Sequence, residues 1–347
     1  MSYLKNIGKF IAVNLLPEDL FRRDISVESA KKLFCDYVEI VEIENHNYCN
    51  RTCWFCPNLK YDRLSKVVLL PDKIFKKIID NLAEINYSQT LVWSRYHEPL
   101  AHDSIIMRLN QARNKLPKAT LTFISNGDYL SAAIVRSLEE NGLDRLMLDL
   151  YLQEGKERDK AEIERALNQF IERTGLSLEK MQGKPYDYEV KGSTIQITMG
   201  VPNYQGKSLS SRGGLIDHPD LQDYQRTAIC VAPIHSVVID YTGHAMLCCQ
   251  VRSDAPEHKK AIIGNLNDEF YTLFDFYRDL ADSRRGLISG GPKSGVCEKC
   301  NVSADTPEYV SRSKFFYFIL KNTPGFKKGF QYFHRRRRAT TRWHKKS

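Results

Sequence analysis

The stretch YVEIVEIENHNYCNRTCWFCPN, residues 37–58, joins an alternating segment to a loop that holds three cysteines. Its first half alternates apolar and acidic side chains, and this periodicity predicts a strand. Cys49, Cys53 and Cys56 then follow within eight positions. Cysteine thiolates ligate zinc and iron–sulfur clusters, so a loop of this kind at the end of a strand is suited to hold a metal centre.

Three thiols do not complete a structural zinc site, which has four ligands. His46 lies at the end of the preceding strand, and no further Cys or His follows Cys56 at the usual spacing. Three thiolates would leave one iron of a 4Fe–4S cube without a protein ligand, so that iron could bind a substrate or cofactor. A zinc loop remains the alternative interpretation.

Predicted strands and helices alternate along residues 36–215. Apolar or alternating runs at 90–94, 119–126, 144–151 and 188–200 predict further strands, and stretches with helical spacing separate them at 71–86, 103–117, 131–143 and 159–176. This order predicts βαβ units around a parallel sheet, fewer than the eight of a closed barrel. We therefore expect an α/β fold with a partial (β/α)6 TIM-like barrel, whose chemistry lies at the carboxyl ends of its strands.

The composition is that of a globular chain, with 347 residues of which 42% are hydrophobic and 27% charged. The sequence has no run of about 18 apolar residues, so it predicts no membrane-spanning helix. The short apolar patch near the start is not followed by a small-residue cleavage site, so we expect a cytoplasmic protein. In that reducing compartment the nine cysteines should be thiols, and clustered thiols indicate metal binding or catalysis.

The spacing C-x3-C-x2-C, with Phe55 before its last cysteine, resembles the signature of the radical S-adenosylmethionine (SAM) superfamily, and the resemblance covers roughly residues 36–215. It implies that Cys49, Cys53 and Cys56 ligate a 4Fe–4S cluster whose open iron chelates SAM. It also implies that an electron, supplied by a donor such as flavodoxin or ferredoxin, cleaves SAM to a 5′-deoxyadenosyl radical. That radical would abstract hydrogen from a substrate.

The resemblance extends to residues that would contact SAM. The family has a Gly-Gly-Glu-Pro-like motif after its second strand, and YHEP at 96–99 keeps Glu98 and Pro99 but replaces both glycines. Glu98 would bind the amine of SAM. Positions that resemble other SAM-contacting places in the family are the turn Ser125, Asn126 and Gly127 after the third strand and Asp149 in the fourth.

A second group of cysteines follows residue 215. The run HSVVIDYTGHAMLCCQV at 235–251 predicts a hairpin that turns at Gly243. Together with a following helix it resembles a small C-terminal twitch or short SPASM domain, in which four cysteines ligate an auxiliary 4Fe–4S cluster; here these would be Cys230, Cys248, Cys297 and Cys300. The neighbouring Cys249 should point to the opposite face of its strand. A zinc ribbon is the alternative.

The last part of the chain is a basic, aromatic tail. Residues 311–347 carry 12 Lys and Arg and no acidic residue, whereas the rest carries 39 basic and 42 acidic side chains. The tail would be solvated, and it would either improve solubility or bind an anionic partner such as nucleic acid, an acidic peptide or a lipid surface. We expect a helical lead-in at 1–35, the barrel at 36–215, the auxiliary domain at 216–305 and the tail at 306–347.

These features predict an enzyme that oxidises a substrate by radical chemistry. The resemblance implies a small hydroxylated metabolite or a peptide as substrate, with the auxiliary cluster taking up an electron. A redox-neutral peptide maturase or epimerase is the alternative, and a zinc-bound scaffold that binds polyanions is a further one. Cys249 and Tyr151 are the candidates for a catalytic side chain.

Overall fold

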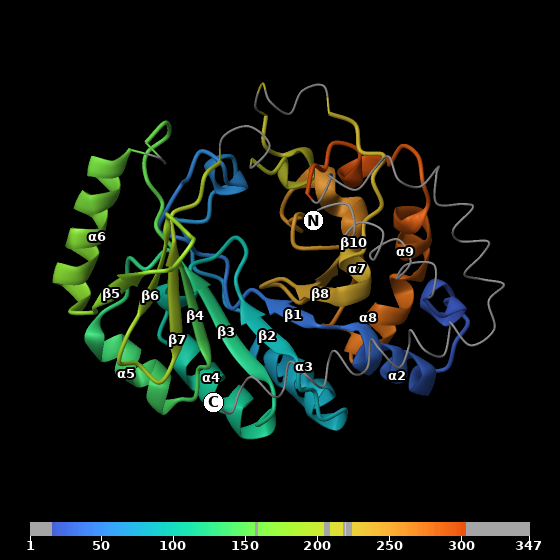
Figure 1. The fold of residues 1–347 in the computed structure, drawn as a ribbon. Coiled ribbons are helices and arrows are strands. Elements are labelled where there is room, and N and C mark those ends of the chain that lie inside the picture. Colours follow the sequence, from blue (N-terminus) through green and yellow to red (C-terminus); the bar gives the residue numbers. More distant parts are fainter. Residues whose placement is uncertain (1–15, 157–158, 205–208, 218, 220–223, 303–347) are drawn as a thin grey trace.

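The computed structural model describes residues 16–156, 159–204, 209–217, 219 and 224–302. The predicted tail and the first 15 residues of the lead-in lie outside these ranges. Within them, one mixed sheet runs through the molecule in the order β10-β9-β8-β1-β2-β3-β4-β7-β6-β5 (Figure 1). Its strands are β1 Ile40–Ile43, β2 Thr90–Trp93, β3 Thr120–Ser125, β4 Arg145–Asp149, β5 Leu178–Lys180, β6 Asp187–Val190, β7 Gln196–Gly200, β8 Ser236–Ile239, β9 His244–Met246 and β10 Ile262–Asn265.

The middle of this sheet is parallel. Strands β8, β1, β2, β3, β4 and β7 pair side by side in one direction, whereas β5, β6, β9 and β10 add to its two edges in antiparallel fashion. A curved parallel sheet with helical crossovers is the predicted partial TIM-like barrel. The second strand expected within residues 188–200 is also present, as β6 and β7.

The two faces of the parallel sheet differ in chemistry because side chains alternate along each strand. On one face the register aligns Ile43, Trp93, Phe123 and Leu146, all fully buried in the main core. On the other face it aligns Glu42 with Val92, Thr122 and then residues of β4 and β7. The barrel therefore has an apolar outer face for its helices and a polar inner face.

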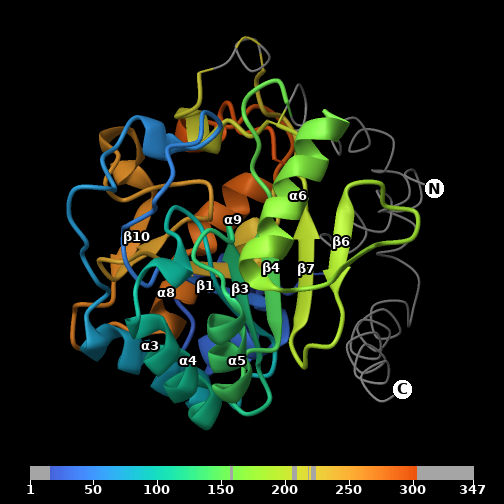
Figure 2. The ribbon, with the colours of Figure 1, turned by 90° about the vertical axis from the view of Figure 1, so that its left-hand side faces the viewer.

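Helices cover the apolar face and the end of the sheet near β8 (Figures 1 and 2). They are α2 Val27–Tyr37, α3 Asp72–Glu84, α4 Ser104–Lys115, α5 Ala132–Glu140, α6 Lys160–Thr174, α7 Ala232–His235, α8 Leu273–Asp279 and α9 Ala281–Ile288. In α3, buried Ile74, Ile78 and Leu82 recur every four residues and so form one apolar stripe. Ser26 is the N-cap of α2, since its hydroxyl accepts a hydrogen bond from Ser29 N at 3.1 Å.

The C-terminal hairpin is continuous with the barrel. Strand β8 pairs with β1 in parallel and β9 folds back on it, so the expected small hairpin extends the barrel's own sheet. The turn needs glycine at position 243, where φ is +87° and a Cβ would stand 2.9 Å from Asn267 Nδ2. Hydrogen bonds between β8 and β1 join residues from both sides of position 215 in one sheet. The domain boundary expected at residue 215 stays a prediction.

The helix expected beyond the hairpin is present as two consecutive helices, α8 and α9, which meet at Leu280. Cys35, near the end of α2, is exposed. The buried face of α2 is formed by Ala30, Leu33 and Phe34, and a helix turns the next position away from that face.

Candidate active site at the carboxyl end of the sheet

The three-cysteine loop leaves the end of β1 and folds into a tight turn. Cys56 N donates to Cys53 O at 3.0 Å, and Cys49 N donates to Arg63 O at 3.3 Å. All three thiols are partly buried and none forms a disulfide. Burial raises the pKa of Cys49 to about 11 and that of Cys53 to about 12, and the neighbouring cysteines in the loop add to both rises.

A positively charged metal centre would relieve this cost, because thiolates so close together repel one another. The donor set is therefore chemically suited to an iron–sulfur cluster held by three cysteines. Across the described part of the chain, no three His, Cys, Asp or Glu side chains are arranged to hold a single metal ion.

An ion pair fastens the cysteine loop to the turn after β3. Arg51 Nε and Nη2 each donate to one oxygen of the Asp128 carboxylate, both at 2.6 Å. Asn50 Nδ2 adds a third bond to Asp128 at 2.7 Å, and Asn126 Nδ2 donates to Asn50 Oδ1 at 2.9 Å. Sequence reasoning missed Arg51 and Asp128, although Asp128 directly follows the predicted Ser-Asn-Gly turn.

Glu98 lies at the centre of the neighbouring strand ends and is almost fully buried. Its carboxylate accepts hydrogen bonds from Ser125 Oγ at 2.6 Å, Asn126 N at 2.8 Å and Leu100 N at 3.1 Å. Burial raises the pKa of Glu98 to about 7 and these hydrogen bonds oppose the rise. The structure thus brings Glu98, Ser125 and Asn126 together, and Glu98 Oε2, which accepts from Asn126 N alone, keeps acceptor capacity for a ligand.

The other residues of these two loops support Glu98. Pro99 starts the short 3-10 helix Pro99–Ala101, which Glu98 caps. Gly127 has a φ of +73°, and its N–H donates to Ser125 Oγ at 3.0 Å. A positive φ favours glycine, so position 127 closes this turn at low steric cost.

Tyr96 and His97 stand where the family motif has glycines, and both are buried. His97 Nε2 accepts from Asn45 N at 3.2 Å, and its ring lies 4.9 Å from that of His46. Burial lowers the pKa of His97 to about 3. His97 is therefore a neutral packing residue at neutral pH, while Tyr96 faces the guanidinium group of Arg95 at 5.3 Å.

Aromatic rings link the cysteine loop to the end of β4. Phe55 stacks on Tyr204 with ring centroids 3.6 Å apart, and it contacts Tyr151 at 5.1 Å. The Tyr151 hydroxyl donates to Asp149 at 3.0 Å. The structure thus connects Phe55 with Asp149 through Tyr151, and it adds Tyr204, which sequence reasoning missed.

A cavity of about 240 Å³ lies beside these residues, between α6 and the end of β4. Its walls include Asn126, Asp128, Asp149 and Tyr151, together with side chains of α6 such as Phe170. The cavity therefore borders two of the positions that resemble SAM-contacting places, Asn126 and Asp149.

The second group of cysteines also gathers in space. Cys300 N donates to Cys297 O at 3.3 Å within one turn, and Cys230 N donates to Leu287 O at 2.9 Å. Burial raises the pKa of the Cys248 thiol, and the nearby thiols of Cys300 and Cys230 raise it further. Burial likewise raises that of Cys297 to about 11, with added repulsion from Cys300 and Cys230. The four thiols, which come from three segments, therefore lie near enough to one another for their charges to interact.

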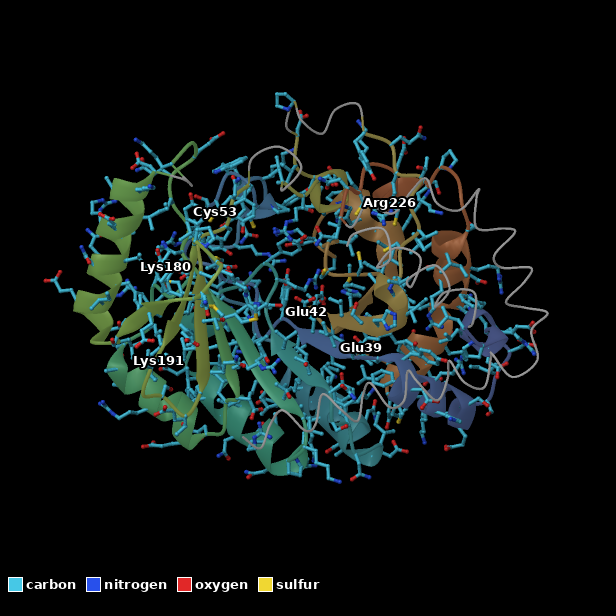
Figure 3. All side chains as sticks on the ribbon, in the orientation of Figure 1. Glu39, Glu42, Cys53, Lys180, Lys191 and Arg226 are labelled. Atoms are coloured by element: carbon cyan, nitrogen blue, oxygen red, sulfur yellow. The ribbon has the colours of Figure 1, made fainter. Side chains whose placement is uncertain are left out.

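A cation accompanies this second group. Arg226 Nη1 donates to Cys300 O at 2.8 Å and approaches Cys300 Sγ at 3.8 Å. In Figure 3, Cys53 lies at the upper left and Arg226 at the upper right of the molecule, and Glu42 lies lower in the view, between them. Cys249 has different charged neighbours from these thiols. Burial raises the pKa of Cys249, and the charged groups that act on it are Glu42, Arg95 and Arg212.

The comparisons with known proteins agree with this arrangement. Residues 44–177 match the model of the Radical SAM superfamily. The S-adenosyl-L-methionine-dependent 2-deoxy-scyllo-inosamine dehydrogenase of Niallia circulans is 23% identical over 272 residues, which cover 78% of this chain and 95% of that protein. BtrN in complex with AdoMet and 2-DOIA has a similar fold, with a TM-score of 0.54 and 19% identity over 76% of this chain and 93% of BtrN. An open conformation of BtrN gives a TM-score of 0.50 at 18% identity, over 76% of this chain and 92% of BtrN.

The chain therefore contains a radical SAM domain. It is a radical SAM enzyme of the oxidoreductase type, and this family implies a 4Fe–4S cluster and SAM as cofactors. Over the described residues, no helix has the length and apolar character needed to cross a membrane.

Proposed function

We propose that this enzyme oxidises a small hydroxylated metabolite, with a 4Fe–4S cluster held by Cys49, Cys53 and Cys56. The observation that carries the proposal is that the loop of these three thiols meets the Glu98 loop at the carboxyl ends of the parallel strands. Glu98 N donates to Tyr48 O at 2.9 Å, so the two loops are joined directly. The name of the Niallia circulans relative, a dehydrogenase of an inosamine, supports a hydroxylated substrate.

The protein's contribution would be to bind and orient SAM. When bound, the cluster and SAM supply a radical that abstracts hydrogen. Glu98 would accept a hydrogen bond from the amine of SAM, with Ser125 and Asn126 fixing the carboxylate. Asn126 and Asp149 border the cavity beside β4, and this position suits contacts to the adenosine part. Phe55, Tyr151 and Tyr204 would exclude water from the cysteine loop.

Cys230, Cys248, Cys297 and Cys300 would ligate a second, auxiliary 4Fe–4S cluster of the twitch or SPASM kind. Oxidation of a hydroxyl group removes two electrons, one with the abstracted hydrogen atom and one from the substrate radical that remains. An auxiliary cluster next to the barrel is a suitable acceptor for the second electron. Arg226 would stabilise its thiolates, because it reaches Cys300 Sγ at 3.8 Å.

Other outcomes of the same chemistry remain open to test. A peptide substrate, or a redox-neutral epimerase in which Cys249 or Tyr151 returns a hydrogen atom, would use the same cofactors. A flavodoxin or ferredoxin as electron donor, a cytoplasmic location and an anionic partner for the basic tail stay predictions. The tail would be tested by comparing the salt dependence of polyanion binding with and without residues 335–347.

Deuterium transfer is the test of the proposed reaction. Anaerobically reconstituted enzyme would be given SAM, a reductant and deuterated inosamines or related cyclitols. The deuterium would be on each carbon that bears a hydroxyl group. We expect deuterium in 5′-deoxyadenosine and a ketone product in equal amounts. Deuterium transfer with return of an inverted alcohol would instead favour an epimerase, and a lack of transfer from all such compounds, with peptides active, would refute a small-molecule substrate.

A further inference from the structure

Exposed apolar side chains gather in one short segment directly after the cysteine loop, residues 59–68. Leu59 is 60% exposed, and Leu64, Val67 and Val68 are 46%, 43% and 36% exposed. Together they are a third of the exposed large apolar side chains in the described part of the chain, although the segment has only ten residues. A concentration of apolar surface of this kind is typical of an interaction site.

Backbone hydrogen bonds attach this segment to two of the three cysteines that would hold the cluster. Leu59 N donates to Cys56 O at 3.1 Å. Cys49 N donates to the carbonyl oxygen of Arg63, the residue before Leu64, at 3.3 Å. The exposed apolar side chains therefore stand on the outer side of the cysteine loop, one hydrogen bond away from its backbone.

The far end of the segment is fixed as well. Asn47 N donates to Val68 O at 3.1 Å, and Val68 N donates in return to Asn47 Oδ1 at 2.7 Å. Asn47 Nδ2 also donates to Lys66 O at 2.9 Å. A surface that is already held in place loses little conformational entropy when a partner binds, so this one is well prepared for docking.

The exposed charge of the segment is positive on balance. Lys60 and Lys66 are both exposed, and neither forms an ion pair with another described residue. Asp62 is the one exposed acidic side chain within residues 59–68, and its carboxylate accepts from Leu64 N at 2.8 Å and from Ser65 N at 3.1 Å. The carboxylate is thus engaged inside the segment, whereas both ammonium groups are available to a partner.

A neighbouring turn adds a third lysine. The Tyr61 hydroxyl donates to Glu257 at 2.9 Å, which joins the segment to the 3-10 helix Pro256–Ala261. Side chains three positions apart in a 3-10 helix lie above one another, so the exposed Lys260 lies on the same side of this helix as Glu257. The docking patch, as we name it, consists of Leu59, Lys60, Leu64, Lys66, Val67 and Lys260.

We propose that the docking patch binds an acidic electron-carrier protein, which delivers one electron to the cluster held by the cysteine loop. The inference rests on the proposed function and names the partner of that same site. An apolar centre with charged side chains around it is the composition of a protein interface, and the lysines complement an acidic partner. One electron passes from the carrier to the cluster, and no bond forms or breaks in this step.

The position of the patch explains why the partner is an electron carrier. SAM cleavage needs an electron from outside the chain, and a carrier must come close to the cluster that it reduces. Interfaces of transient redox partners are at the small end of the size range for protein complexes. A ten-residue segment with one adjoining helical turn suits such an interface.

Binding of flavodoxin, an acidic one-electron carrier, tests the proposal, with ferredoxin as a second probe. Calorimetry on anaerobic holoenzyme at low ionic strength gives the dissociation constant of each. We expect it to rise at least ten-fold for one of these probes when Leu64→Ser and Lys66→Glu are combined. The matched control combines Met107→Ser and Lys118→Glu: Met107 is 49% exposed on α4, and Lys118 is exposed before β3, at the opposite end of the sheet.

Formation of 5′-deoxyadenosine from SAM gives a second readout. With the reduced carrier as electron source, the patch variant should be at least ten-fold slower than wild type. With dithionite, a small reductant that needs no docking surface, the two should be equally fast. Circular dichroism of each variant checks its fold.

Several outcomes would overturn the proposal. These are failure of wild type to bind either carrier at submillimolar concentration, unchanged binding in the patch variant, an equal loss in the control, or an equal loss of rate with dithionite. Unchanged carrier binding with altered sedimentation, or with altered adsorption to phosphatidylglycerol vesicles, would assign the patch to a second copy of the chain or to a lipid surface. Failure of the proposed function is separate, because the enzyme would then form no ketone product although carrier binding would still be measurable.

Discussion

Glu98→Gln is the substitution that tests SAM binding most locally. The side chain keeps its shape but loses its charge and one acceptor oxygen. Glu98 Oε1 accepts from both Ser125 and Leu100, whereas Oε2 accepts from Asn126 N alone. The amide of glutamine will therefore place its oxygen at the Oε1 position and its NH2 group against Asn126 N. One buried hydrogen bond is lost, at a cost of about 1–3 kcal/mol in folding free energy.

The loss in SAM affinity has a separate cause. A carboxylate that accepts from an ammonium group contributes about 1.5–3 kcal/mol, so the dissociation constant of SAM should rise roughly ten- to hundred-fold. Since the pKa of Glu98 is raised to about 7, wild-type affinity should fall as the pH drops below 7. The variant should lack this pH dependence, because a glutamine does not titrate.

The assay is SAM binding by calorimetry on anaerobic holoenzyme between pH 6 and about pH 8, with iron content measured in parallel. Glu139→Gln is the matched control: its carboxylate also accepts from a serine hydroxyl, that of Ser193 at 2.6 Å, and from a backbone amide, Thr194 N at 2.9 Å, but it lies outside the site. An unchanged SAM dissociation constant in Glu98→Gln, with normal iron, would remove Glu98 from the SAM site.

Three further predictions concern the metal centres and the loops around them. Replacing Cys49, Cys53 and Cys56 by alanine should reduce iron from about eight to about four per chain and abolish SAM cleavage, whereas Cys35→Ala, on the exposed face of α2, should change neither; iron and sulfide analysis checks this. Asp128→Asn should weaken the partly exposed pair with Arg51 and lower the free energy of unfolding by about 1–2 kcal/mol in urea titrations. Gly213→Ala should destabilise by about 1–3 kcal/mol, because φ is +65° and the new Cβ would stand 2.7 Å from His258 Nε2; unchanged stability would contradict the close packing at this turn.

The parallel core was predictable because its signals are local. Strand-to-helix alternation reported the sheet and its helices, and Gly243 reported the hairpin turn. Strand β5 was missed because Leu178–Lys180 is a three-residue, largely polar edge strand with little pattern to read. The pairing of β8 with β1 joins segments almost 200 residues apart, and periodicity carries no information about such pairing.

In the candidate site, too, residues with a local sequence signal were predicted, and residues that depend on contacts between distant segments were not. The cysteines and Glu98 were found because their spacing resembles a family motif. Arg51, Asp128 and Tyr204 were missed because ordinary residue types acquire a role here only through contacts between distant loops.

The measurement that tests the central claim most directly is SAM cleavage together with metal analysis on one anaerobic preparation. We predict about eight irons with matching sulfide per chain, and 5′-deoxyadenosine formed from SAM on addition of dithionite. The variant that lacks Cys49, Cys53 and Cys56 should form none while it keeps about four irons. One tightly bound zinc without sulfide, and no 5′-deoxyadenosine from the wild-type enzyme, would contradict the account.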